Sequence, residues 1–226
     1  MKPKILLLHG SGTNPIIFKT QSRKLAALIS PEFELVYLTG FHERGPGPGV
    51  LPFFEGAEPY YKWLSDDTLE EEELHWTSGL EQLLEEYDDN GPFAGVIGFS
   101  QGAKAGMYLV RRLEEEGRPV GFFMSICGTS PFQGSFEGEK GEKYRQSLLQ
   151  GRVSRTQSYH VIGSDDPWRL QSEALLEFFD GNVARVCRFQ GGHHMPLDNF
   201  ANKKMAELIM EGHYGRRGHR VGDSGY

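Results

Sequence analysis

The segment Gly98-Phe99-Ser100-Gln101-Gly102 constrains the fold of this chain more than any other feature. The apolar run from Ala94 to Phe99 predicts a short buried strand, and the residues from Gln101 to Leu113 predict a helix. A strand, a sharp turn and a helix around Gly-x-Ser-x-Gly leave the serine hydroxyl exposed at the carboxyl edge of a sheet. Side chains two positions either side of the serine would collide in such a turn, so glycine is required at both. Ser100 is therefore a candidate nucleophile.

Strand-like and helix-like segments alternate along the rest of the chain. The expected strands are 4–8, 33–38, 94–99, 120–126, 159–162 and 184–189, and the expected helices are 16–29, 69–87, 101–113, 168–179 and 197–210. Apolar strands separated by helices predict an α/β fold, with a mostly parallel sheet covered by helices on both faces. A chain of 226 residues suits one domain, which we place at residues 1–211. The tail at 212–226, rich in Gly, Arg and His, is expected to be disordered.

A serine hydroxyl needs a base within hydrogen-bond reach, and the base needs an orienting acid. In the α/β-hydrolase fold the acid and then the histidine follow the serine along the chain, each after a later strand. Gly163-Ser164-Asp165-Asp166-Pro167 follows the strand at 159–162, and either aspartate fits. We favour Asp166, which lies deeper in the loop. Gln190-Gly191-Gly192-His193-His194 follows the strand at 184–189, where we favour His193 as the base over His194.

The negative oxygen of an acyl-transfer intermediate needs preorganised donors. One expected donor is the backbone N–H of Gln101, just after the nucleophile. We assign the second to the N–H of Ser11, in the loop His9-Gly10-Ser11-Gly12-Thr13-Asn14 after the first strand. His9 is then structural, and Gly12 is expected to let the chain pass close to substrate. The loop matches neither common glycine-rich phosphate-binding pattern, so nucleotide binding is the lesser alternative.

Two long connections, at 40–67 and 129–155, follow strands and end at the edge where α/β folds place ligands. The first contains Phe53, Phe54, Tyr60 and Trp63, which we expect to form a substrate-binding wall or lid. The alternative is that these rings only hold the loop against the body. The adjacent His193 and His194 lack the spacing and further ligands of a metal site, so neither a metal nor another cofactor is expected.

Charge and hydropathy exclude several classes of function. A formal charge of −7, without a basic stripe, disfavours nucleic-acid binding. No apolar run approaches the roughly 18 residues of a membrane span. Cys127 and Cys187 stand in apolar surroundings and are interpreted as reduced core thiols of a cytoplasmic protein.

Taken together, the loop after the first strand, the Ser100 turn, Gly163-Ser164-Asp165-Asp166 and Gly192-His193-His194-Met195-Pro196 resemble the FSH family of serine hydrolases. The resemblance extends over nearly the whole chain. It implies an α/β-hydrolase fold with Ser100, Asp166 and His193 at the triad positions. It also implies an esterase or thioesterase acting on a small-molecule acyl ester or thioester. Some relatives act in fungal polyketide pathways, which makes an acyl carrier protein a candidate partner.

Three functions remain open on the sequence alone. The leading hypothesis is hydrolysis through an acyl-enzyme on Ser100, releasing or editing a polyketide-type product. The alternative is cyclisation or elimination on a polyketide-like scaffold, with His193 as general base in the same pocket. A binding module that keeps the scaffold without catalysis is disfavoured by the complete set of candidate groups.

Overall fold

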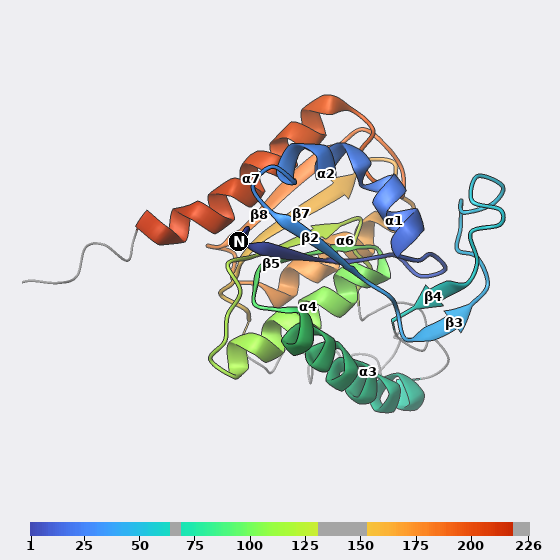
Figure 1. Ribbon diagram of the computed structural model, residues 1–226, viewed down its shortest axis with the longest axis horizontal. Coiled ribbons are helices and arrows are strands. Elements are labelled where there is room, and N and C mark those ends of the chain that lie inside the picture. The colour runs from blue at the N-terminus through green and yellow to red at the C-terminus, as the bar shows by residue number, and fades with distance from the viewer. Residues whose placement is uncertain (64–68, 131–152, 219–226) are drawn as a thin grey trace, which may run out of the picture.

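The centre of the molecule is a six-stranded sheet with the strand order β2-β1-β5-β6-β7-β8 (Figure 1). This computed structural model describes residues 1–63, 69–130 and 153–218. Every neighbouring pair in the sheet is parallel. The strands are β1 (Lys4–Leu8), β2 (Glu34–Leu38), β5 (Phe93–Phe99), β6 (Phe122–Ile126), β7 (Gln157–Gly163) and β8 (Ala184–Phe189). The parallel sheet predicted from the apolar runs is confirmed.

Helices cover both faces of this sheet, as the alternation of elements predicts (Figure 1). One face carries α1 (Pro15–Gln21), α2 (Arg23–Ile29) and α7 (Asn199–Gly218). The other carries α3 (Leu69–Asn90), α4 (Gln101–Glu115) and the short 3₁₀ helix η1 (Leu175–Phe178), which follows α6 (Arg169–Ala174). The arrangement is the α/β-hydrolase fold.

Each face of the sheet has its own hydrophobic core. In β1, Leu6 and Leu8 pack into the core under α3 and α4, whereas Ile5 and Leu7 pack under α1, α2 and α7. All four side chains are buried. A strand buried on both faces has no polar side to present, which explains why β1 is a continuous apolar run rather than an alternating one.

Several helix boundaries differ from the sequence prediction. The helix expected at 168–179 is instead α6 followed by the 3₁₀ helix η1. The helix expected at 16–29 is broken at Ser22, whose hydroxyl donates to the carbonyl of Phe18 at 2.6 Å and competes with the regular helical pattern. Helix α7 continues to Gly218, past the expected domain end at 211, and the His213 ring packs edge-on against Phe33. Residues 212–218 of the expected disordered tail are therefore helical, and 219–226 lie outside the described residues.

The first long connection contains a two-stranded antiparallel hairpin that the sequence did not predict. It pairs β3 (His42–Arg44) with β4 (Tyr60–Lys62). The Tyr61 backbone bonds to the loop after β1, since its N–H donates to Thr13 at 2.7 Å and its carbonyl accepts from Gly12 at 2.8 Å. The hairpin is thereby fixed beside the carboxyl end of β1. Most of the second connection, at 131–152, lies outside the described residues, as does 64–68.

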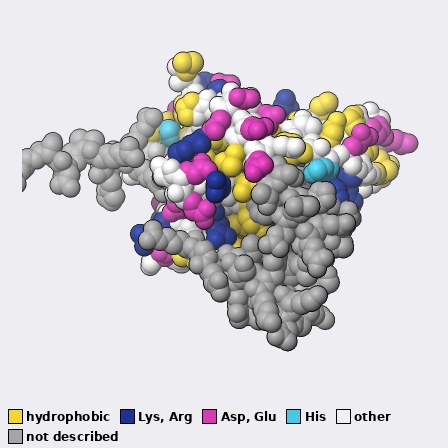
Figure 2. Space-filling view, turned by 90° about the horizontal axis from the view of Figure 1, so that it is seen from below, with side chains coloured by type: hydrophobic (Ala, Val, Ile, Leu, Met, Phe, Trp, Pro, Cys, Tyr) yellow, Lys and Arg dark blue, Asp and Glu magenta, His cyan; other side chains and the backbone are white. Residues whose placement is uncertain are grey.

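The part of the chain that the structure describes contains no helix with both the length and the apolar character needed to cross a membrane. On the face seen in Figure 2, acidic and basic side chains are interspersed over the visible described surface. Neither sign of charge dominates that face, although the whole chain is acidic overall.

Candidate active site

Ser100 occupies the turn between β5 and α4 in a conformation that side-chain-bearing residues rarely adopt. Its φ is 55° and its ψ is −122°. A Cβ at Gly98 would overlap the backbone of Ala103, and a Cβ at Gly102 would overlap the carbonyl oxygen of Leu8. Gly98 is therefore required by the turn itself, as expected from the sequence, whereas Gly102 is required by its contact with the end of β1. The turn leaves the Ser100 side chain at the carboxyl edge of the sheet.

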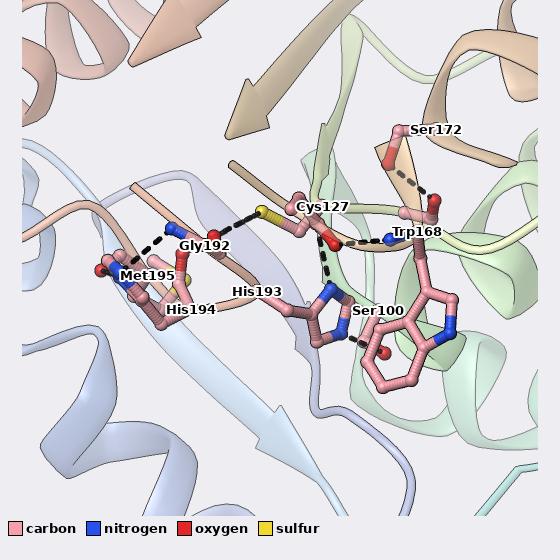
Figure 3. Close-up of polar contacts among 10 residues, drawn as sticks. Ser100, Cys127, Trp168, Ser172, Gly192, His193, His194 and Met195 are labelled. Carbon is pink, nitrogen blue, oxygen red and sulfur yellow. Dashed lines mark hydrogen bonds and ion pairs between the residues drawn. The ribbon is translucent and has the colours of Figure 1, made fainter. Parts of the chain in front are cut away.

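Ser100, His193 and Asp166 form one continuous hydrogen-bonded chain (Figure 3). The Ser100 hydroxyl lies 2.9 Å from Nε2 of His193, and Nδ1 of His193 lies 2.9 Å from Oδ2 of Asp166. The other carboxylate oxygen of Asp166 accepts the backbone N–H of Trp168 at 2.8 Å. The Asp166 side chain is fully buried, whereas that of His193 is 14% exposed. An imidazole between a hydroxyl and a buried carboxylate can accept a proton from the hydroxyl.

The neighbouring candidates make different contacts. Asp165 is exposed, and its carboxylate accepts a hydrogen bond from the side chain of Gln190 at 2.6 Å. The His194 ring stays within its own loop: Nδ1 donates to the carbonyl of Met195 at 2.9 Å, and Nε2 accepts from the N–H of Gly192 at 3.2 Å. Asp165 and His194 thus hold the two loops in shape, while Asp166 and His193 meet each other.

The His193 ring is held between two aromatic side chains. The Trp168 ring stands perpendicular to it with centroids 4.3 Å apart (Figure 3). The Phe99 ring centroid lies 5.3 Å from that of His193. Burial lowers the pKa of His193 from its usual 6.5, and the hydrogen bond to Asp166 opposes this effect. Sequence reasoning missed Trp168 as a site residue. Its position directly after Asp166-Pro167 was the available signal.

The lowered pKa of His193 predicts where activity falls in acid. The neutral imidazole is the form that accepts a proton, so activity is complete above this pKa and is lost as the pH falls through it. We expect the acid limb of kcat/KM, measured on a neutral ester between about pH 4 and 8, to have a midpoint below 6.5. A midpoint above 6.5 would contradict a buried neutral base.

The loop after β1 lies directly beside the nucleophile. A Cβ built on Gly10 would be 3.3 Å from the Cβ of Ser100. Ser11 and Gln101, the two expected oxyanion donors, line the same cavity as Ser100. Gly12, which was expected to lie close to substrate, is not among the residues that line this cavity. It has a φ of 75°, and its carbonyl accepts the N–H of Gly47 at 2.9 Å, so its close approach is to the Pro-Gly segment of the first long connection.

His9 holds this loop in place. Its ring is fully buried, with Nδ1 2.8 Å from the carbonyl of Gly10 and Nε2 2.9 Å from the backbone N of Gly40. Because Nε2 accepts the Gly40 N–H, the proton of the neutral ring is on Nδ1 and is donated to Gly10. Burial lowers the pKa of His9 to about 4. His9 therefore stays neutral near pH 7 and serves a structural purpose.

A cavity of about 730 Å³ opens in front of Ser100. Its apolar wall consists of Val50, Phe54, Phe99, Trp168, Met195 and Leu197. Of the four aromatic residues expected to bind substrate, the structure places Phe54 in this lining. Phe53 is 83% exposed, and Tyr60 is buried with its hydroxyl bonded to the Phe54 carbonyl at 3.0 Å.

Trp63 is also buried away from the lining, because its indole N–H donates to the carbonyl of His9 at 2.7 Å. The expected wall is therefore corrected to a smaller aromatic contribution from the first connection. The alternative considered for these rings, attachment of the loop to the body, describes Tyr60 and Trp63.

Cys127 lies behind the hydrogen-bonded chain and completes the one metal-like grouping among the described residues. Potential ligand atoms of Cys127, Asp166 and His193 all lie within 4.8 Å of one another. The Cys127 Sγ lies 3.8 Å from the Gly192 carbonyl and faces that of His194 (Figure 3). Burial raises the pKa of this thiol to about 12, so it remains protonated. A protonated thiol is a poor nucleophile, and we interpret Cys127 as a contact that supports the histidine loop.

Three comparisons with known proteins bear on this arrangement. A family model described as serine hydrolase (FSH1) matches residues 1–205. The chain is similar to the esterase FUS5 of Gibberella fujikuroi, with 34% identity over 92% of this chain and 86% of the relative. It is also similar to the thioesterase FSL2 of Gibberella zeae, with 29% identity over 92% and 91% of the two chains. Among solved structures, esterase PE8 superposes with a TM-score of 0.62 and 21% identity, covering 93% of this chain and 92% of that one.

Proposed function

The chain belongs to the FSH1 family of serine hydrolases, and from this membership and the site geometry we propose how it works. It is a serine hydrolase of carboxylic esters or thioesters. We assign the nucleophile to Ser100, the base to His193 and the orienting acid to Asp166. The observation that carries this assignment is the unbroken chain of two 2.9 Å contacts from the Ser100 hydroxyl through His193 to Asp166.

Acylation begins when the Ser100 oxygen attacks the carbonyl carbon of the substrate. His193 Nε2 takes the hydroxyl proton as the bond forms, and Asp166 stabilises the resulting imidazolium through Nδ1–H. The tetrahedral intermediate collapses when His193 returns this proton to the leaving oxygen or sulfur. An alcohol or thiol departs, and the acyl group remains on Ser100.

The negative oxygen of the intermediate needs donors that are already in place. We assign them to the backbone N–H groups of Gln101 and Ser11. Gln101 begins α4, so the positive end of the helix dipole adds to the effect. The contact of Gly10 with Ser100 supports Ser11 as the second donor, because it brings the following peptide to the same side of the cavity.

Deacylation repeats these steps with water. The water oxygen attacks the acyl carbonyl while His193 takes a proton from the water. His193 then protonates the Ser100 oxygen as the free acid leaves. The apolar wall of the cavity supports a substrate with an extended acyl chain, and we propose a polyketide-type chain carried as an ester or as a carrier-bound thioester. The relatives, an esterase and a thioesterase by name, favour hydrolysis over the cyclisation or elimination alternative.

The proposal predicts an acyl-enzyme on Ser100. The full-length protein is mixed with p-nitrophenyl esters or N-acetylcysteamine thioesters, quenched in acid within the first turnover and examined by intact and peptide mass spectrometry. We expect the mass of the acyl group on the peptide containing Ser100, and its absence from the Ser100→Ala variant. A dehydrated or cyclised product, with neither adduct nor free acid, would instead establish the alternative.

A further inference from the structure

We infer that the substrate of this site presents an anionic oxygen group to Arg44, either a carboxylate on the acyl chain or a phosphate on the leaving group. This inference rests on the proposed function and extends it to the chemistry of the substrate. It starts from the charge of the cavity. The described lining includes Arg23, Arg44 and Lys104 but neither aspartate nor glutamate.

This basic lining contrasts with the rest of the molecule. The chain has 31 acidic and 24 basic residues, and its visible described surface mixes the two signs (Figure 2). The cationic residues of the cavity come from separate elements: Arg23 begins α2, Arg44 ends β3, and Lys104 lies in the first turn of α4. Several independent elements thus supply one sign of charge to one cavity, which raises the local concentration of anionic ligands.

Arg44 is the member of this group whose side chain is bonded to the loop beside the reacting serine. Its guanidinium donates to the hydroxyl of Ser11 at 2.6 Å. Ser11 follows Gly10, which lies against Ser100. The β3–β4 hairpin fixes this position, because Arg44 pairs with Tyr60 and the adjacent Tyr61 bonds to the loop after β1.

The chemistry of a guanidinium favours an oxygen anion as the ligand. Its planar fork of five N–H donors can bind the Ser11 hydroxyl and a carboxylate or phosphate oxygen together. The bond to Ser11 restrains the side chain before substrate binds, so less conformational entropy is lost on binding. Arg44 is exposed, so a ligand that enters the cavity can reach its guanidinium, whereas Lys104 is buried in the same lining.

The test compares substrates that differ only in charge. In the first arm, p-nitrophenyl esters of adipic acid and of its isosteric monoamide share one leaving group. In the second arm, one acyl group is presented as a thioester of pantetheine or of 4′-phosphopantetheine. We expect Arg44→Gln to lower the charged-to-neutral ratio of kcat/KM about 10- to 100-fold in the arm that carries the anion, with partial recovery in Arg44→Lys.

Arg185→Gln is the matched control. It removes the same charge as Arg44→Gln, but Arg185 pairs with Glu211 on the outer surface. Its ratio is expected to stay within about twofold of the wild type. Arg44→Gln also loses the contact with Ser11, and this loss lowers the turnover of the charged and the neutral substrate of each pair alike. The charged-to-neutral ratio of kcat/KM therefore reports anion recognition alone. Equal changes of both members in both arms would overturn the inference.

A binding measurement separates this inference from the catalytic proposal. Monomethyl adipate is compared with its neutral amide, and 4′-phosphopantetheine with pantetheine, by calorimetric titration into full-length Ser100→Ala, with and without Arg44→Gln. If the acyl chain carries the anion, monomethyl adipate binds more tightly than its amide and loses this advantage in the Arg44→Gln background. If the leaving group carries it, phosphopantetheine shows this pattern instead. These outcomes hold even if Ser100 proves not to be the nucleophile, and indifference of both ligand pairs to Arg44 would refute the inference.

Discussion

Ser100→Ala is expected to lower kcat for ester and thioester hydrolysis by at least about 10⁴-fold. The variant removes the oxygen that forms the acyl-enzyme, while the elbow, the imidazole and the proposed oxyanion donors remain. Alanine is smaller than serine and leaves the backbone of the turn in place, so the thermal unfolding midpoint should change little. The residual rate should reflect substrate binding and the oxyanion donors alone.

The measurement is kcat on a p-nitrophenyl ester, calculated from the concentration of folded protein. Ser30→Ala serves as the matched control, because Ser30 is exposed at the end of α2 and far in the chain from the site. Activity in Ser100→Ala within about tenfold of the wild type would remove Ser100 from the mechanism. Cys127 would not replace it, since its thiol is buried and its pKa is about 12.

Asp166→Asn is expected to lower kcat by about 10⁴-fold while leaving the fold intact. One Asp166 oxygen accepts the N–H of Trp168, and the asparagine must keep an oxygen there. Its amide NH₂ then points at Nδ1 of His193 and donates to it. The imidazole proton moves to Nε2, which can no longer accept the proton of Ser100. The variant thus keeps the shape of the side chain, with one oxygen replaced by nitrogen, but reverses the tautomer of His193.

Asp165→Asn provides a closely matched control for this change. Asp165 is the adjacent residue, but its carboxylate is exposed and bonds to Gln190. We expect its kcat to stay within about threefold of the wild type. Similar losses in the two variants would show that the loop, rather than the contact between Asp166 and His193, determines activity. Thermal unfolding of both variants checks that the folded fraction is equal.

The turn at Ser100 could be predicted because its requirements leave a short, fixed pattern of residue types in the sequence. Gly98 and Gly102 are needed by backbone atoms within a few residues or on the adjacent strand, and these requirements are visible in the sequence pattern. The parallel sheet was equally accessible, since strands buried on both faces produce continuous apolar runs such as β1.

The choice between adjacent residues was harder to make from the sequence. Asp165 and Asp166 follow the same strand, and His193 and His194 follow the next one. Which member of each pair points inward depends on the course of the two loops. The structure pairs Asp166 with His193 and directs Asp165 to Gln190. The sequence offered a preference for Asp166, based on its depth in the loop, and a preference for His193, but no direct measure of where either side chain points.

The cavity wall was the least predictable part. Aromatic side chains in a long connection look alike in the sequence, yet Trp63 is buried against His9 while Phe54 faces the cavity. Arg44 was not expected at the site, because the β3–β4 hairpin that carries it has short strands without a clear alternating pattern. Trp168 was missed because its contact with His193 is a contact between two loops.

The sequence by itself determined the class of fold, the position of the exposed serine and the order in which an acid and a histidine follow it. Those properties arise from apolar periodicity and from close backbone contacts around one turn, and both leave a recognisable pattern of residue types along the chain. Only the tertiary structure decided which carboxylate meets which imidazole, which ring faces the cavity and which arginine reaches the loop beside Ser100. Ser100 and His193 are 93 positions apart, and the alignment of such distant groups depends on how whole loops pack in space.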